Sequence, residues 1–183
     1  MTVRPGVKAE KPNWKVGYEW RYAWKQNDRS GTYTSEIVRE ETFEGIPSYV
    51  IRSGKNEDFY GKDVLGHIAR KTAGQLVFKR SSPRINYLWP LEVGKEWPIS
   101  YLRENIQEKS SETFNYRMVV AKMENVTVPA GTFETFKVEV YIPYTGKLFA
   151  EYWYSPTVKR AVKEREYLDA GLREEELAGF KVD

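Results

Sequence analysis

Aromatic residues occupy every second position of the segment 18–25, namely Tyr18, Trp20, Tyr22 and Trp24, and alternate with Glu19, Arg21, Ala23 and Lys25. Successive side chains of a β-strand point to opposite faces, so this period of two predicts a strand with an aromatic face and a polar face. The same alternation recurs in the segments 97–101, 114–120 and 136–142. The pattern therefore favours strands over helices through most of the chain.

Turn-forming sequences separate these predicted strands. Ala73-Gly74 is typical of a hairpin turn, and glycine and proline interrupt the chain again at 129–132 and 143–146. We therefore predict an all-β fold of about 10–12 antiparallel strands in a curved sheet that forms a barrel or half-barrel. Five residues are expected to be buried in its core, namely Trp20, Trp97, Phe136, Val138 and Trp153.

A short motif occurs twice. Val-Gly-x-Glu-Trp begins at Val16 and again at Val93, and a proline precedes each copy. We interpret the two copies as the starts of duplicated halves, residues 14–89 and 90–183, that close one shared core. The chain is then a single β domain over 14–183, preceded by a polar, proline-containing tether over residues 1–13.

The C-terminal segment allows two interpretations. Residues 173–177 are strong helix formers, which alone would favour a short helix from about Leu168 to Ala178. The repeat instead aligns Ala170-Gly171 with the hairpin turn at Ala73-Gly74. We predict a final hairpin, with the short helix as the alternative.

The amino-acid composition excludes several classes of function. The 183 residues are 40% hydrophobic, 30% charged and 15% aromatic, with a net charge of +3 and no cysteine. Disulfides and cysteine chemistry are excluded, and the weak charge does not indicate a nucleic-acid partner. No apolar run approaches the roughly 20 residues of a membrane-spanning helix, so we expect a protein that does not span a membrane.

Three segments carry a resemblance to a known group of proteins: 126–133 (VTVPAGTF), 137–139 (KVE) and 152–160 (YWYSPTVKR). They resemble uncharacterised bacterial envelope proteins of the TapB-like kind, exported or lipid-anchored, over most of residues 95–182. Those families are distantly similar to the lipoprotein-localisation carriers, which wrap a curved sheet around acyl chains. The resemblance implies a non-enzymatic role in the periplasm or outside the cell, with a signal or lipid anchor removed upstream of Met1.

Candidate catalytic chemistry is sparse. His67 is the only histidine, and its sequence neighbours offer no diagnostic partner for a triad or a metal site. Adjacent carboxylates such as Glu40-Glu41 and Glu57-Asp58 point to opposite faces of a strand, so they do not form a catalytic pair. We therefore expect no catalytic residues, no metal and no cofactor. A hydrolase with carboxylates in the barrel mouth is the alternative.

The abundance of tyrosine and tryptophan points to a binding role. Rings with a polar atom need a partner at one end, which suits a wet groove better than a dry core. We predict that an apolar or amphipathic ligand, such as a lipid, contacts Tyr22, Trp24, Tyr101 and Tyr154. The protein could instead act as a scaffold that binds another envelope protein and no small ligand, which is the alternative within this hypothesis.

Overall fold

The computed structural model describes residues 6–183, which form twelve β-strands and no helix. The strands are β1 (Glu19–Gln26), β2 (Arg29–Phe43), β3 (Ile46–Ser53), β4 (Asn56–Gly61), β5 (His67–Thr72), β6 (Gln75–Arg84), β7 (Glu96–Asn105), β8 (Ser110–Val128), β9 (Gly131–Tyr141), β10 (Leu148–Ser155), β11 (Arg160–Leu168) and β12 (Gly171–Lys181). The prediction of an all-β protein is confirmed.

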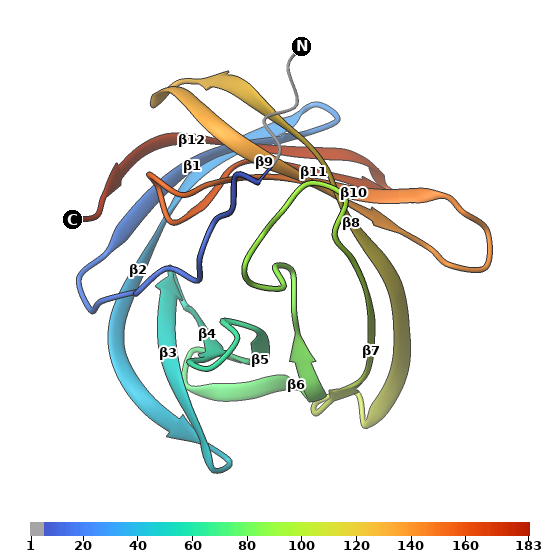
Figure 1. The fold of residues 1–183 in the computed structure, drawn as a ribbon. Helices are drawn as coiled ribbons and strands as arrows, with labels where there is room; N and C mark the ends of the chain where they lie inside the picture. Colours follow the sequence, from blue (N-terminus) through green and yellow to red (C-terminus); the bar gives the residue numbers. More distant parts are fainter. Residues whose placement is uncertain (1–5) are drawn as a thin grey trace.

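The strands form a closed antiparallel barrel in which each strand pairs with its neighbours in the sequence. The first and last strands close the ring, with Glu19 of β1 opposite Lys181 of β12. Figure 1 shows the strands arranged in a ring. Closure satisfies the backbone groups that a half-barrel would leave at two open edges.

The C-terminal segment forms the predicted hairpin, with Leu168 opposite Gly171 across the turn. Charged pairs across the two strands explain why helix propensity does not prevail here. Lys163 lies opposite Glu176, with Nζ 2.7 Å from Oε1, and Arg165 lies opposite Glu174 with Nε 2.5 Å from Oε2. Such cross-strand pairs stabilise the sheet.

Two segments outside the strands cross one end of the barrel, the N-terminal segment and the connection between β6 and β7 (Figure 1). They join where Ala9 N donates to Leu91 O at 3.0 Å and Leu91 N donates to Ala9 O at 2.8 Å. Of the predicted tether over 1–13, residues 1–5 lie outside the described part of the chain. Ala9 itself is buried against the barrel.

The expected core residues are buried as predicted: Trp20, Trp97, Phe136, Val138 and Trp153 are each at most 5% exposed. The two tryptophans of the repeated motif also satisfy their indole nitrogens. Nε1 of Trp20 donates to Val158 O and Nε1 of Trp97 donates to Ile85 O, each at 2.9 Å. Both rings therefore anchor a connecting segment to the barrel wall.

The two copies of the motif make matching backbone contacts. Gly17 N donates to Ile37 O at 2.8 Å, and Gly94 N donates to Val120 O at the same distance. The register of each strand pair shifts directly after these acceptors, between Ile37 and Arg39 and between Val120 and Lys122. These matches support a structural repeat, but duplication of the halves stays a prediction.

Candidate functional site

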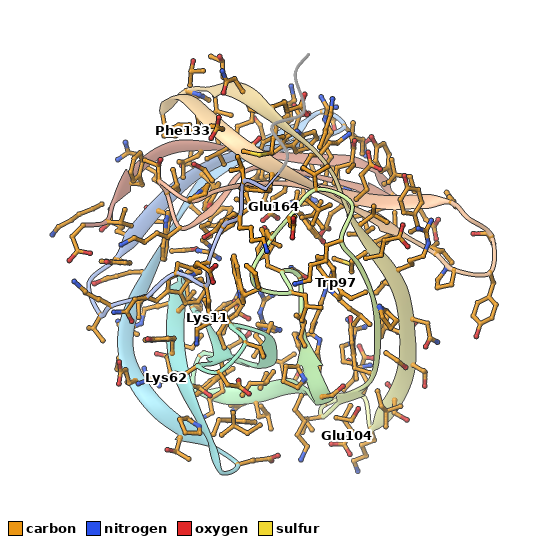
Figure 2. All side chains as sticks on the ribbon, in the orientation of Figure 1. Lys11, Lys62, Trp97, Glu104, Phe133 and Glu164 are labelled. Atoms are coloured by element: carbon orange, nitrogen blue, oxygen red, sulfur yellow. The ribbon has the colours of Figure 1, made fainter. Side chains whose placement is uncertain are left out.

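Inward-facing side chains of ten strands, β1–β7 and β10–β12, line a cavity of about 610 Å³ inside the barrel. Its lining is strongly polar and includes four acidic residues, His67 and several tyrosines. Figure 2 shows Glu164 within the ring of strands, whereas Glu104 and Phe133 lie at the periphery. The cavity also contains six arginines, which are Arg70, Arg80, Arg84, Arg103, Arg160 and Arg173.

The only histidine is held between an acid and an arginine on the cavity wall. Oδ1 of Asp58 lies 2.7 Å from Nε2 of His67 and 2.8 Å from Nε of Arg70. On the other side of the ring, Arg80 Nη1 donates to Nδ1 of His67. Because Nδ1 accepts this bond, the proton of the neutral imidazole lies on Nε2 and is donated to Asp58.

Burial and hydrogen bonding fix the charges of this group. Burial lowers the pKa of His67 to about 4, so the ring is neutral at neutral pH. Burial alone would raise the pKa of Asp58, but the hydrogen bonds from His67 and Arg70 hold it below its ordinary value. Both ring nitrogens of His67 are already engaged, which leaves neither free to act as a general base.

Sequence reasoning missed the partners of His67. Asp58 lies on β4 and Arg70 on β5, and the register places these two residues directly opposite each other. Recognising the segment 62–66 as a connection between two antiparallel strands would have brought Asp58 near His67. The hydrogen bond from Arg80, which reaches the ring from β6, depends on the curvature of the sheet as well.

Two further arginines of the cavity form ion pairs. Arg173 Nη2 lies 2.6 Å from Oε1 of Glu175, whose Oε2 accepts a hydrogen bond from Tyr33. Arg103 Nη2 lies 3.4 Å from Oε2 of Glu112, an exposed residue. These two guanidiniums, like that of Arg70, therefore each have a carboxylate partner.

Neutral groups hold Arg84 and Arg160, as the neutral ring of His67 holds Arg80. Arg84 donates from Nη2 to the Tyr152 hydroxyl at 2.9 Å and from Nε to Oδ1 of Asn86 at 3.1 Å. The guanidinium of Arg160 lies over the ring of Trp20, 4.9 Å from its centroid, and Nη1 is buried without a hydrogen-bond partner. Among residues 6–183, no carboxylate lies within the 4.0 Å ion-pair distance of either guanidinium.

Two acidic side chains of β11 also line the cavity. Burial, reinforced by the nearby carboxyls of Glu175 and Glu166, raises the pKa of Glu164 to about 8. Burial raises the pKa of Glu166 as well. Glu164 is therefore largely protonated at neutral pH and does not balance the charge of the arginines.

A second, smaller cavity of about 60 Å³ adjoins the first at the end of the barrel that the N-terminal segment covers. Aromatic rings dominate its wall, including Trp14, Tyr87, Trp89 and Tyr154. The centroids of Trp89 and Tyr154 lie 5.1 Å apart in an edge-to-face contact. The residues that line both cavities are Tyr60, Arg84, Asn86, Arg160 and Glu164.

The four predicted ligand contacts do not form one surface. Tyr22 lines the polar cavity and donates its hydroxyl to Ala161 O at 2.7 Å, whereas Tyr154 lines the aromatic cavity. Tyr101 is buried, and Trp24 lies near the β1–β2 turn with the guanidinium of Arg173 4.6 Å from its ring. Their role as ligand contacts stays a prediction.

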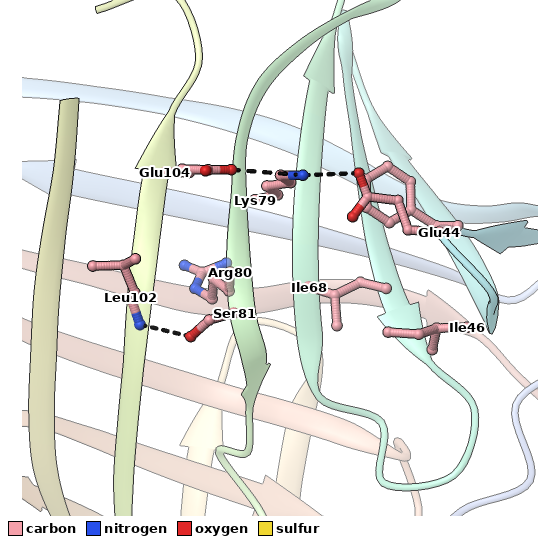
Figure 3. Close-up of a pocket in the computed structure, with 9 residues that line it drawn as sticks. Glu44, Ile46, Ile68, Lys79, Arg80, Ser81, Leu102 and Glu104 are labelled. Atoms are coloured by element: carbon pink, nitrogen blue, oxygen red, sulfur yellow. Dashed lines mark hydrogen bonds and ion pairs between the residues drawn. The ribbon is translucent and has the colours of Figure 1, made fainter. Parts of the chain in front are cut away.

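A depression of about 300 Å³ lies on the barrel wall where β6 and β7 separate (Figure 3). The register of these two strands covers only Phe78–Arg80 of β6. Beyond these pairs, Ser81 Oγ accepts a hydrogen bond from Leu102 N at 2.9 Å. Within them, Lys79 bridges Glu44 and Glu104. Arg80 lines both this depression and the inner cavity.

Among residues 6–183, no group of three or more His, Asp or Glu side chains is arranged to hold a metal ion. The same residues contain no helix with the length and apolar character needed to cross a membrane.

No family model and no curated protein matches the sequence. Among solved structures, the chain is similar to a protein from Bacteroides fragilis that is named as exported and has a YmcC-like fold. The two sequences are 14% identical, and the structures superpose with a TM-score of 0.53 over 96% of this chain and 100% of the other. The chain is also similar to a protein from Parabacteroides distasonis named as a lipoprotein, with 15% identity and a TM-score of 0.48 over 96% and 100% of the two chains. A third similar structure is the hypothetical lipoprotein YmcC from Escherichia coli, with 13% identity and a TM-score of 0.44 over 91% and 85%. The likeness to the Bacteroides fragilis protein shows that this chain has a YmcC-like fold.

Proposed function

We propose that this chain is an exported, non-catalytic protein of the bacterial envelope that holds an amphipathic small molecule inside its barrel. The observation that carries the proposal is the polar cavity of about 610 Å³, which adjoins a small aromatic cavity. Volumes of about 300–1,000 Å³ are typical of small-molecule sites. A ligand with a polar body and an apolar end matches the two linings.

Fold likeness supports the export part of this proposal. The protein from Bacteroides fragilis that shares the YmcC-like fold is named as exported. The absence of cysteine is compatible with either an oxidising or a reducing compartment, so composition does not oppose export.

The state of the titratable groups supports a non-catalytic role. His67 uses both ring nitrogens, and Glu175 already accepts bonds from Arg173 and Tyr33. A general base or nucleophile needs a free lone pair within reach of its substrate. The polar groups of this wall instead hold one another in place.

The cavity lining argues for an amphipathic ligand over a wholly apolar one. An acyl chain placed beside Arg84 and Arg160 would remove water from two guanidiniums without offering them a hydrogen-bond acceptor. Burying charged groups in that way is strongly unfavourable. A polar group on the ligand removes this penalty.

Two measurements test the proposal. Fractionation of the source bacterium, followed by detection with an antibody, should place the protein in the envelope or the medium. Native mass spectrometry of protein purified without detergent from those fractions should reveal a bound small molecule that is released on denaturation. A cytosolic location would contradict export, and a ligand-free protein that also binds nothing in a metabolite extract would contradict the binding role.

Carboxylate-dependent hydrolysis is the second candidate, because Glu164 and Glu175 line one cavity with different environments. The raised pKa of Glu164 fits a general acid, and a second carboxyl in the same cavity is what a glycosidase also needs. A panel of aryl glycosides tests this candidate with wild type, Glu164→Gln and Glu175→Gln. Hydrolysis by wild type that both substitutions abolish would replace the non-catalytic proposal, and no turnover by wild type would support it.

A further inference from the structure

Arg160 is fixed in the barrel by aromatic rings. Its guanidinium lies 4.9 Å from the ring centroid of Trp20 and 5.8 Å from that of Tyr22. Cation–π contacts of this kind position the planar group through its face and leave the N–H donors in the plane unused. Nη1 is one such donor, buried and without a partner.

Arg84 reaches the same boundary from β6. Its Nε and Nη2 donate to Asn86 and Tyr152, and its guanidinium lies 5.6 Å from the ring centroid of Tyr116. All of these partners are neutral, so they orient the guanidinium without forming an ion pair with it. Tyr152 is fully buried, which makes this arrangement a rigid part of the wall.

Among residues 6–183, three arginines of the cavity, Arg80, Arg84 and Arg160, have no carboxylate at ion-pair distance, and of these only Arg84 and Arg160 also line the aromatic cavity. Arg70, Arg103 and Arg173 each have a carboxylate partner. Glu164, which lines the same boundary, is held largely protonated at neutral pH by its burial. Positive charge in a half-buried site without a counter-ion is unfavourable, so this boundary favours the binding of an anion.

We propose that Arg84 and Arg160 form an oxyanion site for a carboxylate or phosphate group, placed where the polar and aromatic cavities meet. The fork of N–H donors on arginine matches the oxygens of both groups. An anion bound there has the rings of Trp89 and Tyr154 on one side, so the ligand is an organic anion with a ring or short apolar substituent. This inference rests on the proposed function and names the class of its ligand.

Isothermal titration calorimetry at pH 7 tests the site with four probes: inorganic phosphate, phenyl phosphate, benzoate, and short-chain phosphatidic acid below its micelle concentration. The wild-type protein should bind at least one of these anions and should not bind benzyl alcohol, which has the ring but no charge. Phenyl phosphate or benzoate as the tightest probe identifies a soluble organic anion. Phosphatidic acid as the tightest identifies a lipid headgroup.

Variants separate the site from the general charge of the cavity. Arg160→Gln and Arg84→Gln should each weaken anion binding by about tenfold or more, the effect of one charge-assisted hydrogen bond. The matched control is Arg103→Gln, which removes a guanidinium of the same cavity that already has a carboxylate partner, and it should change affinity by less than threefold. Equal losses in all three variants, or none in Arg160→Gln, would overturn the site.

A second measurement applies if either glutamine variant does not fold. Crystals of the wild-type protein soaked in selenate should show an anomalous peak in contact with both guanidiniums, and a barrel without that peak would contradict the proposal. Failure of this inference is distinguishable from failure of the proposed function. A neutral ligand recovered from the envelope, with affinity unchanged in Arg160→Gln, would leave the binding role intact and refute only the anion site.

Discussion

Nε2 of His67 lies 2.7 Å from Oδ1 of Asp58, so the single histidine of the chain links β5 to β4 inside the barrel. Its ring also accepts a hydrogen bond from Arg80 of β6. The neutral imidazole thus connects three consecutive strands of the wall. Because the neutral form of His67 makes these contacts, protonation of its ring should destabilise the fold in acid.

We predict that acid destabilises the protein through His67. The pKa of His67 is about 4 in the folded chain and 6.5 in the unfolded chain. Between these values the unfolded chain binds a proton that the folded chain does not, so lowering the pH through this window favours unfolding by up to about 3 kcal/mol. Urea denaturation at several pH values should show this loss in wild type and a flatter profile in His67→Gln. Parallel profiles for the two proteins would contradict the assignment.

The raised pKa of Glu164 makes stability depend on pH in the opposite direction. Its pKa is about 8 in the folded chain and 4.5 when unfolded. Between these values the folded chain keeps a proton that the unfolded chain has released, so raising the pH through this window favours unfolding. Glu164→Gln should therefore be more stable than wild type at pH 9, by about 1–3 kcal/mol, and similar to it at pH 4. The exposed Glu134→Gln serves as the control and should track wild type throughout.

Removal of a motif tryptophan should test the core directly. Trp97→Ala deletes a ring that is 5% exposed and leaves Ile85 O without its 2.9 Å hydrogen bond. We expect a loss of about 3–5 kcal/mol in the free energy of unfolding, as for other large core aromatics. Tyr144→Ala, at a side chain 88% exposed, should change it by less than about 0.5 kcal/mol. A denaturation midpoint that Trp97→Ala leaves unmoved would place this ring outside the stable core.

The repeat predicts that equivalent glycines respond alike to substitution. Gly17 and Gly94 have φ angles of +94° and +91°, a region that alanine adopts only with strain. Gly17→Ala and Gly94→Ala should each lower the free energy of unfolding by about 1–2 kcal/mol. A large cost at one site and none at the other would argue against equivalent halves. Superposition of residues 14–89 on 90–183 is the direct geometric check.

Local pattern was enough to predict the strands, because alternation such as that from Tyr18 to Trp24 depends only on the strand backbone. It also placed Trp20 and Trp97 in the core. The repeat was needed to predict the hairpin at Gly171, since the propensity of residues 173–177 favours a helix. Charged pairs with the neighbouring strand, which propensity does not include, stabilise the observed strand.

The chemistry of the cavity was beyond the reach of local pattern. Arg160 meets Trp20 across 140 positions of the chain because β1 and β12 close the ring, and only the closed topology brings them together. The aromatic row at Tyr22 and Trp24 indicated a binding surface but gave no sign of the arginines that share it. Polar residues on a strand are usually taken as solvent-facing, and in this barrel many of them face inward.

The central claim is that the barrel holds an organic anion between its polar and aromatic cavities. A crystal structure of the wild-type protein grown with phenyl phosphate tests this claim most directly. We expect phosphate density in contact with Arg84 and Arg160, and the phenyl ring beside Trp89 and Tyr154. Density for the ligand elsewhere, or a barrel that stays unoccupied at saturating phenyl phosphate, would contradict it.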